Sequence, residues 1–393
     1  MQWQVVSLSD IADITSSKRI YASDYTDTGI PFYRSKEVIE LHNNREISVE
    51  LYISGKKYQE IKSKYGVPAK GDILLTSVGT LGIPYLITND APFYFKDGNL
   101  TWFRNLHGVS AEFLYYFLLS PHAKRQFEEI TIGSTQKALT IVNLKKVKLY
   151  LPDIIVQKEI VKRLIYLDDK MKRNTEQITV LFQMITSIFN SWFLDEMKNR
   201  EWLQSNAKAN IREIREKNKQ EKDYPVLSVV KEGEFKASED VFTKQVYSKS
   251  TKNYKIVRRN QVAYNPARAN IGSIAMLKDY DIGLVSPIYT VFEIKDTITP
   301  TFFYYYMKQP MFREMIKHHA IGTTRQNFPF EAFSMFPMVI PPMDLQLEFE
   351  ETAKLIEQKI TKLKEENQVL AEIRDTILPE LMSGELPVEV GEE

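Results

Sequence analysis

The sequence contains no cysteine among its 393 residues, which excludes disulfides, thiolate nucleophiles and zinc–thiolate sites. Histidine occurs only five times. The one adjacent pair, His318 and His319, does not predict a metal site, because neighbouring side chains on a helix point in different directions. No apolar run approaches about 18 residues, and no basic segment followed by an apolar stretch opens the chain. These absences predict a cytoplasmic protein that has no membrane span, no signal peptide and no bound metal.

Motifs for catalysis are also missing. The sequence has neither a Gly-x4-Gly-Lys-Ser/Thr phosphate loop nor a Gly-x-Gly-x-x-Gly dinucleotide loop. Asn265-Pro266 is similar to the start of the Asn-Pro-Pro-aromatic motif of amino-methyltransferases, but Ala267 and Arg268 break the match. We therefore expect a non-catalytic chain that binds no cofactor of its own.

What the sequence does contain is a long internal repeat. Tyr115-Tyr116-Phe117 returns as Tyr304-Tyr305-Tyr306, an offset of 189 residues, and the same offset relates Gln157 to Gln346. The segment 71–75 matches 260–264 only in its strand-like pattern. A period this long is far beyond that of a solenoid, so each copy is predicted to be a domain with its own appendage.

The appendages are predicted to be long helices with apolar residues at heptad spacing, near 155–194 and 345–382. Two such stripes are predicted to pack on each other as an antiparallel coiled coil, unless they dock into a larger partner. Two asparagines inside the stripes are predicted to fix the register of the pair. The predicted seam consists of Ile160, Leu164, Leu167, Met171, Asn174, Ile178, Leu181 and Ile185 on the first helix, and Ile356, Ile360, Leu363, Asn367, Leu370 and Ile377 on the second.

The predicted fold class is mixed α/β, or α+β. Two globular recognition domains are separated by the two long helices, and an internal pseudo-twofold relates the two copies. We expect the following segments: a first recognition domain 1–150, a central helical region 151–200, a charged linker or helix extension 201–221, a second recognition domain 222–341, a C-terminal helical region 342–386 and an acidic tail 387–393.

The net charge of +1 hides an uneven distribution. Residues 222–341 carry 16 basic against 11 acidic side chains, whereas 342–393 carry 5 against 14. Lys and Arg neutralise DNA phosphates, and Arg, Lys, Asn and Gln read base edges when a rigid support holds them. Loop-like stretches of both copies carry such residues, and the predicted DNA contacts are Lys18, Arg19, Arg34, Lys36, Gln136, Lys137, Lys249, Lys252, Lys255, Arg258, Asn265, Arg268, Asn270, Arg325 and Gln326. Because these loops differ between the copies, we expect an asymmetric target read in two halves.

Several segments together resemble the specificity subunits of type I restriction-modification enzymes. Residues 3–14 resemble the start of that family's target recognition domain, and 132–137, 157–160, 189–193 and 378–386 are further similar segments. In the second copy, 233–240, 244–246 and 253–257 follow the family's style, although no clear Trp-x4-Leu-x-x-Ile opening is apparent there.

The resemblance implies double-stranded DNA as a partner, two methyltransferase subunits, and restriction or translocase subunits that join them. It implies that S-adenosylmethionine, ATP and Mg²⁺ are bound by those partners. It also implies adenine methylation in a two-part sequence, with the helices setting a spacer of roughly one DNA turn, about 34 Å. Two alternatives stay open at this stage: a coiled-coil scaffold that never touches DNA, and an enzyme that modifies DNA itself.

Overall fold

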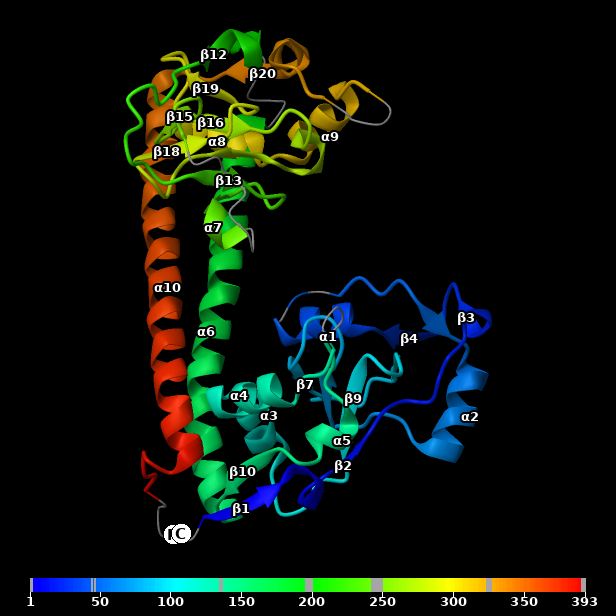
Figure 1. Ribbon diagram of the computed structural model, residues 1–393. Coiled ribbons are helices and arrows are strands. Elements are labelled where there is room, and N and C mark those ends of the chain that lie inside the picture. Colours follow the sequence, from blue (N-terminus) through cyan, green and yellow to red (C-terminus); the bar gives the residue numbers. More distant parts are fainter. Residues whose placement is uncertain are drawn as a thin grey trace. The chain divides into compact units, whose positions relative to one another are not determined.

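The computed structural model describes residues 3–43, 45, 47–133, 137–194, 201–241, 250–322 and 327–389 (Figure 1). The chain divides into two units. The first comprises residues 1–174 and 364–393, and the second comprises 175–363. Each unit therefore combines one globular module with a part of both long helices, α6 (Ile154–Phe189) and α10 (Met343–Ser383). No helix of the described residues has the length and apolar character needed to cross a membrane.

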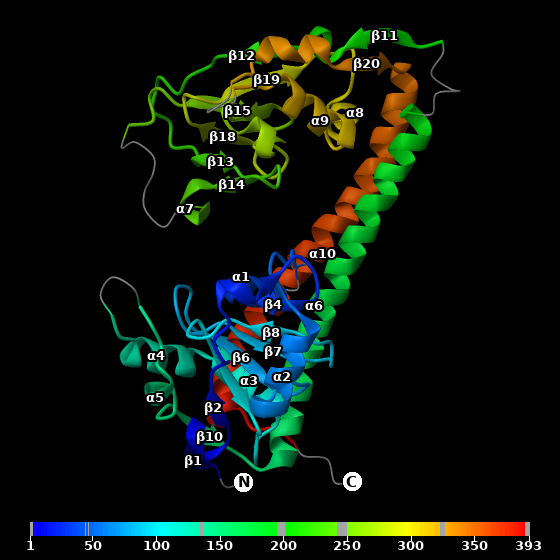
Figure 2. The ribbon, with the colours of Figure 1, turned by 90° about the vertical axis from the view of Figure 1, so that its right-hand side faces the viewer.

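The first module is built on a four-stranded antiparallel sheet of order β2-β9-β6-β7. A second sheet, β3-β5-β4-β8, adjoins it, and β1 pairs with β10 at the point where the chain enters α6 (Figure 2). Its strands are β1 (Gln4–Ser7), β2 (Asp13–Thr15), β3 (Tyr25–Thr26), β4 (Ile30–Tyr33), β5 (Tyr52–Ile53), β6 (Ile73–Thr76), β7 (Pro84–Leu86), β8 (Tyr94–Phe95), β9 (Leu100–Arg104) and β10 (Lys148–Leu151). Its helices are α1 (Ser35–His42), α2 (Gly55–Tyr65), α3 (Ala111–Leu119), α4 (Pro121–Ile130) and α5 (Ile141–Leu144).

The second module repeats this plan. Its sheet has the order β12-β19-β16-β17, and β11 pairs with β20 where β1 pairs with β10 in the first module. The small sheets differ: β13 pairs with β14, and β15 pairs with β18. The elements are β11 (Leu203–Asn206), β12 (Ile211–Ile214), β13 (Leu227–Val229), β14 (Phe235–Ala237), α7 (Ser238–Val241), β15 (Lys255–Arg258), β16 (Val262–Tyr264), β17 (Ile274–Met276), β18 (Ile282–Val285), β19 (Thr290–Ile294), α8 (Pro300–Met307), α9 (Pro310–His319) and β20 (Pro337–Ile340).

One predicted segment is wrong. Residues 201–221 are not a linker or a helix extension, because they contain β11 and β12, the first two strands of the second module. Ile211 pairs with Ile294 in the main sheet and Ala207 is fully buried, so this charged segment is folded around a few apolar anchors. The second module begins near 203 rather than at 222. Trp202 is its counterpart of Trp3, and Ala207 stands where the first module has Leu8.

Each module shares its apolar core with the long helices. In the first unit, Ile160 and Leu164 of α6 and Leu381 of α10 belong to the same buried cluster as α3 of the module. In the second unit, Phe189 of α6 and Phe349 of α10 are packed with α8, with a ring distance of 5.5 Å between them. Burial of a large apolar side chain contributes about 1.5–3 kcal/mol, so the helices are part of what stabilises each module.

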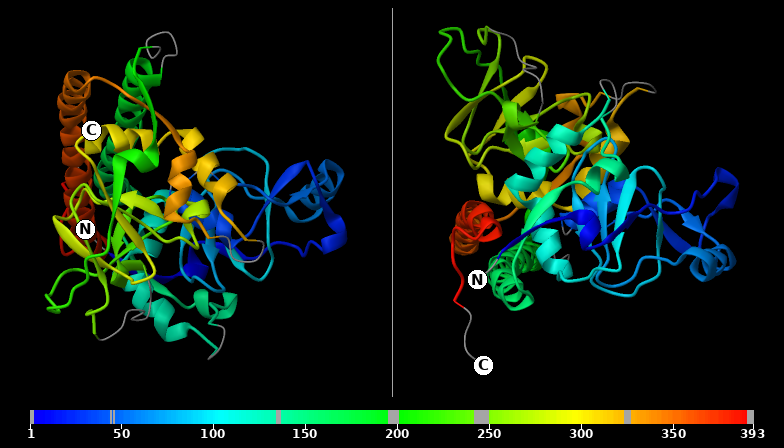
Figure 3. Two further views of the ribbon diagram at one scale, coloured as in Figure 1. Left: turned by 90° about the horizontal axis from the view of Figure 1, so that it is seen from above. Right: turned by 60° about the horizontal axis from the view of Figure 1, so that its bottom comes forward.

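The two helices pack together and run antiparallel within the first unit (Figures 1 and 3). Asp168 contacts Arg374 at 3.1 Å, whereas Asn174 contacts Asn367 at 2.9 Å, so the α6 numbers rise as the α10 numbers fall. Lys170 pairs with Glu366 beside them. None of the predicted seam side chains is exposed.

Candidate nucleic-acid interface

In the first module, basic and aromatic side chains line a groove of about 290 Å³. The ammonium group of Lys18 lies 4.7 Å from the ring centre of Tyr65. The guanidinium of Arg104 lies 4.6 Å from the Trp102 ring, and its Nη1 donates to the Tyr65 carbonyl at 3.0 Å. No carboxylate is among the described residues that line the groove, and Lys64 adds a third cation. Cations held over aromatic faces are fixed in position but remain available to an anion.

Arg19, Arg34 and Lys36, all predicted DNA contacts, are engaged in ion pairs. Arg19 pairs with Asp97 at 2.9 Å. Arg34 bridges Glu37 and Glu50 at the start of α1, and Lys36 also binds Glu50. Hydrogen bonds from Lys36 and Arg34 lower the pKa of Glu50 to about 2. The side chains of Arg19 and Lys36 are 67% and 48% exposed, and exposed pairs contribute little to stability, so a phosphate can compete for these two cations. Glu37 is only 1% exposed, so the pair that holds Arg34 is not an exposed one.

The loop after α4 carries two further predicted contacts. Lys137 is exposed at the end of the loop, next to a short pairing between Ile132 and Ala138. Gln136 lies outside the described residues. In the second module the corresponding pairing joins Ile321 and Asn327. Arg325 and Gln326, and likewise Lys249, lie outside the described residues.

The β15 strand of the second module positions two of the predicted cations differently. Arg258 is exposed and holds Glu216 through two hydrogen bonds, of 2.5 and 2.9 Å. Lys255 is half-buried and donates to the Tyr289 carbonyl, and desolvation lowers its pKa. Lys252 is exposed in the turn before the strand. Of the three, Lys252 and Arg258 face solvent, whereas Lys255 supports the strand.

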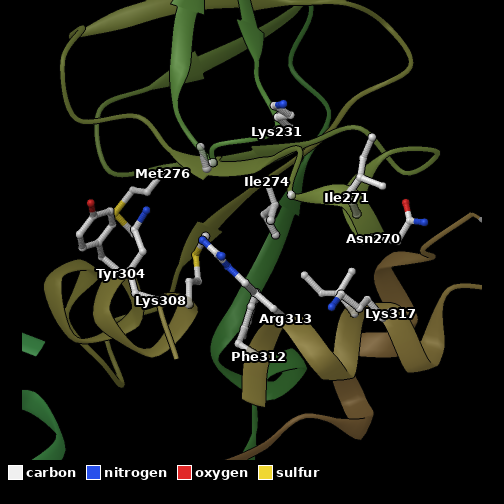
Figure 4. A pocket seen from close by; sticks show the side chains of 16 residues that line it. Lys231, Asn270, Ile271, Ile274, Met276, Tyr304, Lys308, Phe312, Arg313 and Lys317 are labelled. Atoms are coloured by element: carbon white, nitrogen blue, oxygen red, sulfur yellow. The ribbon is translucent and has the colours of Figure 1, made fainter. Parts of the chain in front are cut away.

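The turn from Asn265 to Asn270 also divides into structural and exposed residues. Asn265 is buried, and its side-chain oxygen accepts from the Ala267 N–H at 3.0 Å, so it shapes the turn. Arg268 is exposed. Asn270 lines a pocket of about 360 Å³ between β17 and α9 (Figure 4).

Sequence reasoning missed several cations that the fold brings to these two hollows. In the first module these are Lys64 at the end of α2 and Arg104 at the end of β9. In the second module the pocket is lined by Lys231, Lys308, Arg313 and Lys317. Arg313 and Lys317 stand four residues apart on an amphipathic helix, which places both on one face. The four-residue spacing of Arg313 and Lys317 could have predicted a basic helix face from the sequence. The positions of Lys64, Arg104 and Lys231 depend on tertiary packing.

A catalytic centre is not apparent in the described ranges. No group of three His, Asp or Glu residues that could hold a metal ion occurs among them. The buried tyrosines, such as Tyr116 and Tyr305, have pKa values raised by desolvation and donate to Asp168 and Glu357 on the long helices. These groups join module to helix.

Comparison with known families and curated proteins gives a consistent picture. Residues 1–181 match the family model described as the type I restriction modification DNA specificity domain. The type I restriction enzyme MjaIX specificity subunit of Methanocaldococcus jannaschii is 24% identical over 424 aligned residues, which cover 98% of this chain and 94% of that protein. A putative type I restriction enzyme specificity subunit of Haemophilus influenzae, S.HindORF215P, is 34% identical over 178 residues, but the match covers only 45% of this chain and 42% of that protein.

A solved structure supports the fold over the full length. The type I restriction-modification S subunit from M. genitalium superposes with a TM-score of 0.54 at 16% identity, covering 97% of this chain and 96% of that one. The likeness extends over both modules and both long helices.

Proposed function

Because this chain belongs to the family of type I restriction-modification DNA specificity subunits, which are non-catalytic, we propose that each module reads one half of an asymmetric, bipartite DNA target. The observation that carries this proposal is the contrast between the two modules. Their main sheets have the same strand order, but the cation-lined hollow lies next to β2 and β9 in the first module and between β17 and α9 in the second. Equal scaffolds with unequal contact residues suit two different half-sites.

In the first module we assign DNA contact to the groove around Lys18 and to Arg19, Arg34, Lys36, Gln136 and Lys137. In the second we assign it to Lys249, Lys252, Lys255, Arg258, Asn265, Arg268, Asn270, Arg325 and Gln326. The geometry supports different roles within this set. Arg268 and Lys252 are exposed and suited to direct contact, whereas Asn265 and Lys255 are suited to holding their loops in place.

Module exchange tests this proposal. Residues 1–150 are replaced by the first module of a relative with a different target, and methylated bases are mapped by sequencing DNA from cells that carry the hybrid and its methyltransferase partner. We expect one half of the methylated motif to change and the other half to stay. Changes in both halves, or in neither, would contradict modular reading.

The long helices suggest where the methyltransferase subunits bind. Tyr166 on α6 and Val369 and Ile373 on α10 are 66%, 53% and 44% exposed. Tyr166 precedes Lys170 by one turn, and Val369 and Ile373 follow Glu366 by one and two turns. Because Lys170 and Glu366 pair across the helices, all three apolar side chains lie on the same face. We call this group the first apolar patch.

The second unit carries the same patch at the positions related by 189 residues. Leu355, Val180 and Met184 are 70%, 61% and 53% exposed. Solvent-exposed apolar groups of this size on a helix pair mark an interaction site. Two equal patches support two copies of one partner, and we propose that these are methyltransferase subunits. S-adenosylmethionine would then be bound by those subunits, and ATP and Mg²⁺ by restriction or translocase subunits that join the complex.

Charge reversal in one patch tests this assignment. Val369→Glu with Ile373→Glu should reduce the bound methyltransferase from two copies to one, as measured by native mass spectrometry of the co-expressed complex. Adding Val180→Glu and Met184→Glu should abolish binding. The control is Gln368→Glu, which adds one negative charge next to Val369 but about 100° around the helix. If two copies remain bound after the first pair of substitutions, the assignment is wrong.

A further inference from the structure

The pocket between β17 and α9 of the second module has an apolar floor and a cationic rim (Figure 4). Ile274, Met276 and Phe312 contribute to the floor. The rim consists of Lys231, Lys308, Arg313 and Lys317, and no carboxylate is among the described residues that line the pocket. Figure 4 shows the Arg313 side chain at the hollow that Met276 and Ile274 also line. Cations gathered over apolar atoms are less screened than those in open water, so an anion bound here is held more strongly.

Arg313 is the centre of this arrangement. It is exposed, and it forms no ion pair with the residues that the structure describes. Lys317, one turn further along α9, pairs with Glu314 at 2.9 Å, and both partners are exposed. An exposed ion pair between residues three apart contributes little to stability, so Lys317 can leave Glu314 and bind a phosphate at little cost in stability.

The first module carries different side chains at the equivalent place. At the positions related by 189 residues, Lys308 corresponds to Leu119, Arg313 to Lys124 and Lys317 to Glu128. Ile316 corresponds to Phe127, which is buried. The Phe127 ring lies so close to Gly82 that a Cβ atom on residue 82 would be 3.0 Å from the ring. In this alignment the larger Phe127 ring stands where Ile316 lines the pocket of the second module. The cationic rim is therefore a property of the second module, not of the shared scaffold.

We propose that Arg313 and Lys317, with Lys308 and Lys231 around the same pocket, bind the sugar–phosphate backbone of duplex DNA. This inference rests on the proposed function, because it supplies a phosphate-binding surface for the half-site that the second module reads. Arg binds phosphate through two parallel hydrogen bonds, and a helix holds its base rigidly. Contacts of this kind position the protein on DNA without reading sequence.

The salt dependence of binding tests the proposal. The full-length chain, co-purified with its methyltransferase subunits, is titrated against a labelled duplex carrying the target from methylation mapping, and against a scrambled duplex. Each lost phosphate contact lowers the slope of log affinity against log salt by about 0.9. When the salt concentration rises from about 50 to about 200 mM, the factor by which affinity falls should be about 3.5 times smaller for Arg313→Gln than for the wild type. For the double variant with Lys317→Gln, this factor should be about 12 times smaller than for the wild type. Both duplexes should respond alike.

Lys124→Gln is the matched control, because Lys124 is exposed at the equivalent position of the first module. It should leave the slope unchanged. The proposal would be overturned by an unchanged slope in Arg313→Gln, or by an equal fall of the slope in Lys124→Gln. It would also be overturned if Arg313→Gln lost the methyltransferase subunits, because that result would indicate a protein-docking surface. If the wild-type complex shows no preference for the target duplex, the proposed function itself fails. If that preference is present and the slope does not move, only this inference fails.

Discussion

At the residue scale, two glutamines show how the repeat builds the same junction twice. Gln157 is fully buried, accepts from the Ser110 N–H at 2.9 Å, and donates to the carbonyls of Gly108 and Pro152. Gln346 makes the equivalent bonds to the Thr299 N–H and the Pro341 carbonyl. Each glutamine ties the start of a long helix to the loop that begins α3 or α8. The repeat in the sequence identified this pair, but its hydrogen bonds depend on the fold.

Gln157→Ala should destabilise the chain by about 1–3 kcal/mol, because it leaves a buried N–H and two carbonyls without their partner. Chemical denaturation measures this loss. The control is Gln59→Ala on the exposed face of α2, which should stay within about 0.5 kcal/mol of the wild type. Equal stability of Gln157→Ala and the wild type would show that water satisfies the junction.

His42 provides a pH dependence. Burial lowers its pKa below the usual 6.5, only partly offset by the hydrogen bond that Nδ1 donates to the Pro84 carbonyl at 2.9 Å. The unfolded chain therefore takes up a proton first as pH falls, so stability is retained above about pH 6.5 and decreases below it. His42→Gln should remove that part of the acid dependence, as measured by thermal unfolding across this range. A wild-type profile unchanged by the substitution would contradict this.

At the element scale, the two asparagines in the helix seam form one polar contact. Asn174 is 1% exposed and donates to Asn367 at 2.9 Å and to Glu366 at 3.0 Å, while Asn367 donates to the Met171 carbonyl. Heptad spacing predicted that both residues lie in the stripe. That they meet each other, and that Glu366 joins them, required the antiparallel alignment, which a stripe alone does not define.

Removing one partner and replacing both should have opposite effects. Asn174→Ala leaves a buried group unpaired and should cost about 1–3 kcal/mol. Asn174→Leu with Asn367→Leu fills the seam with apolar groups and should raise the thermal stability, at the expense of register specificity. Thermal unfolding of the full chain compares the two. A double variant less stable than Asn174→Ala would argue that the asparagines stabilise the pair rather than select its register.

At the scale of the whole molecule, α6 and α10 each pass from one unit into the other. Deleting 171–177 together with 364–370 removes one heptad from each helix, and with it both seam asparagines, while keeping the stripes in phase. Each helix shortens by about 10.5 Å. If the helices set the distance between half-sites, the nonspecific spacer of the methylated motif should shorten by about 3 base pairs, as read by methylation sequencing. An unchanged spacer would show that the helices do not act as a ruler.

The sequence alone determined the duplication, the two long helices and their apolar stripes, because repeated motifs and heptad spacing are local patterns. It misjudged 201–221, because Ile211 becomes an anchor only by pairing with Ile294 of β19, and Ala207 only by donating its N–H to the Phe336 carbonyl. Only the tertiary structure joined Leu381, near one end of the chain, to the core of the first module at the other end. It alone shows the pocket around Arg313, because that pocket is lined by Lys231, by residues of β17 and by residues of α9, which are far apart in the sequence.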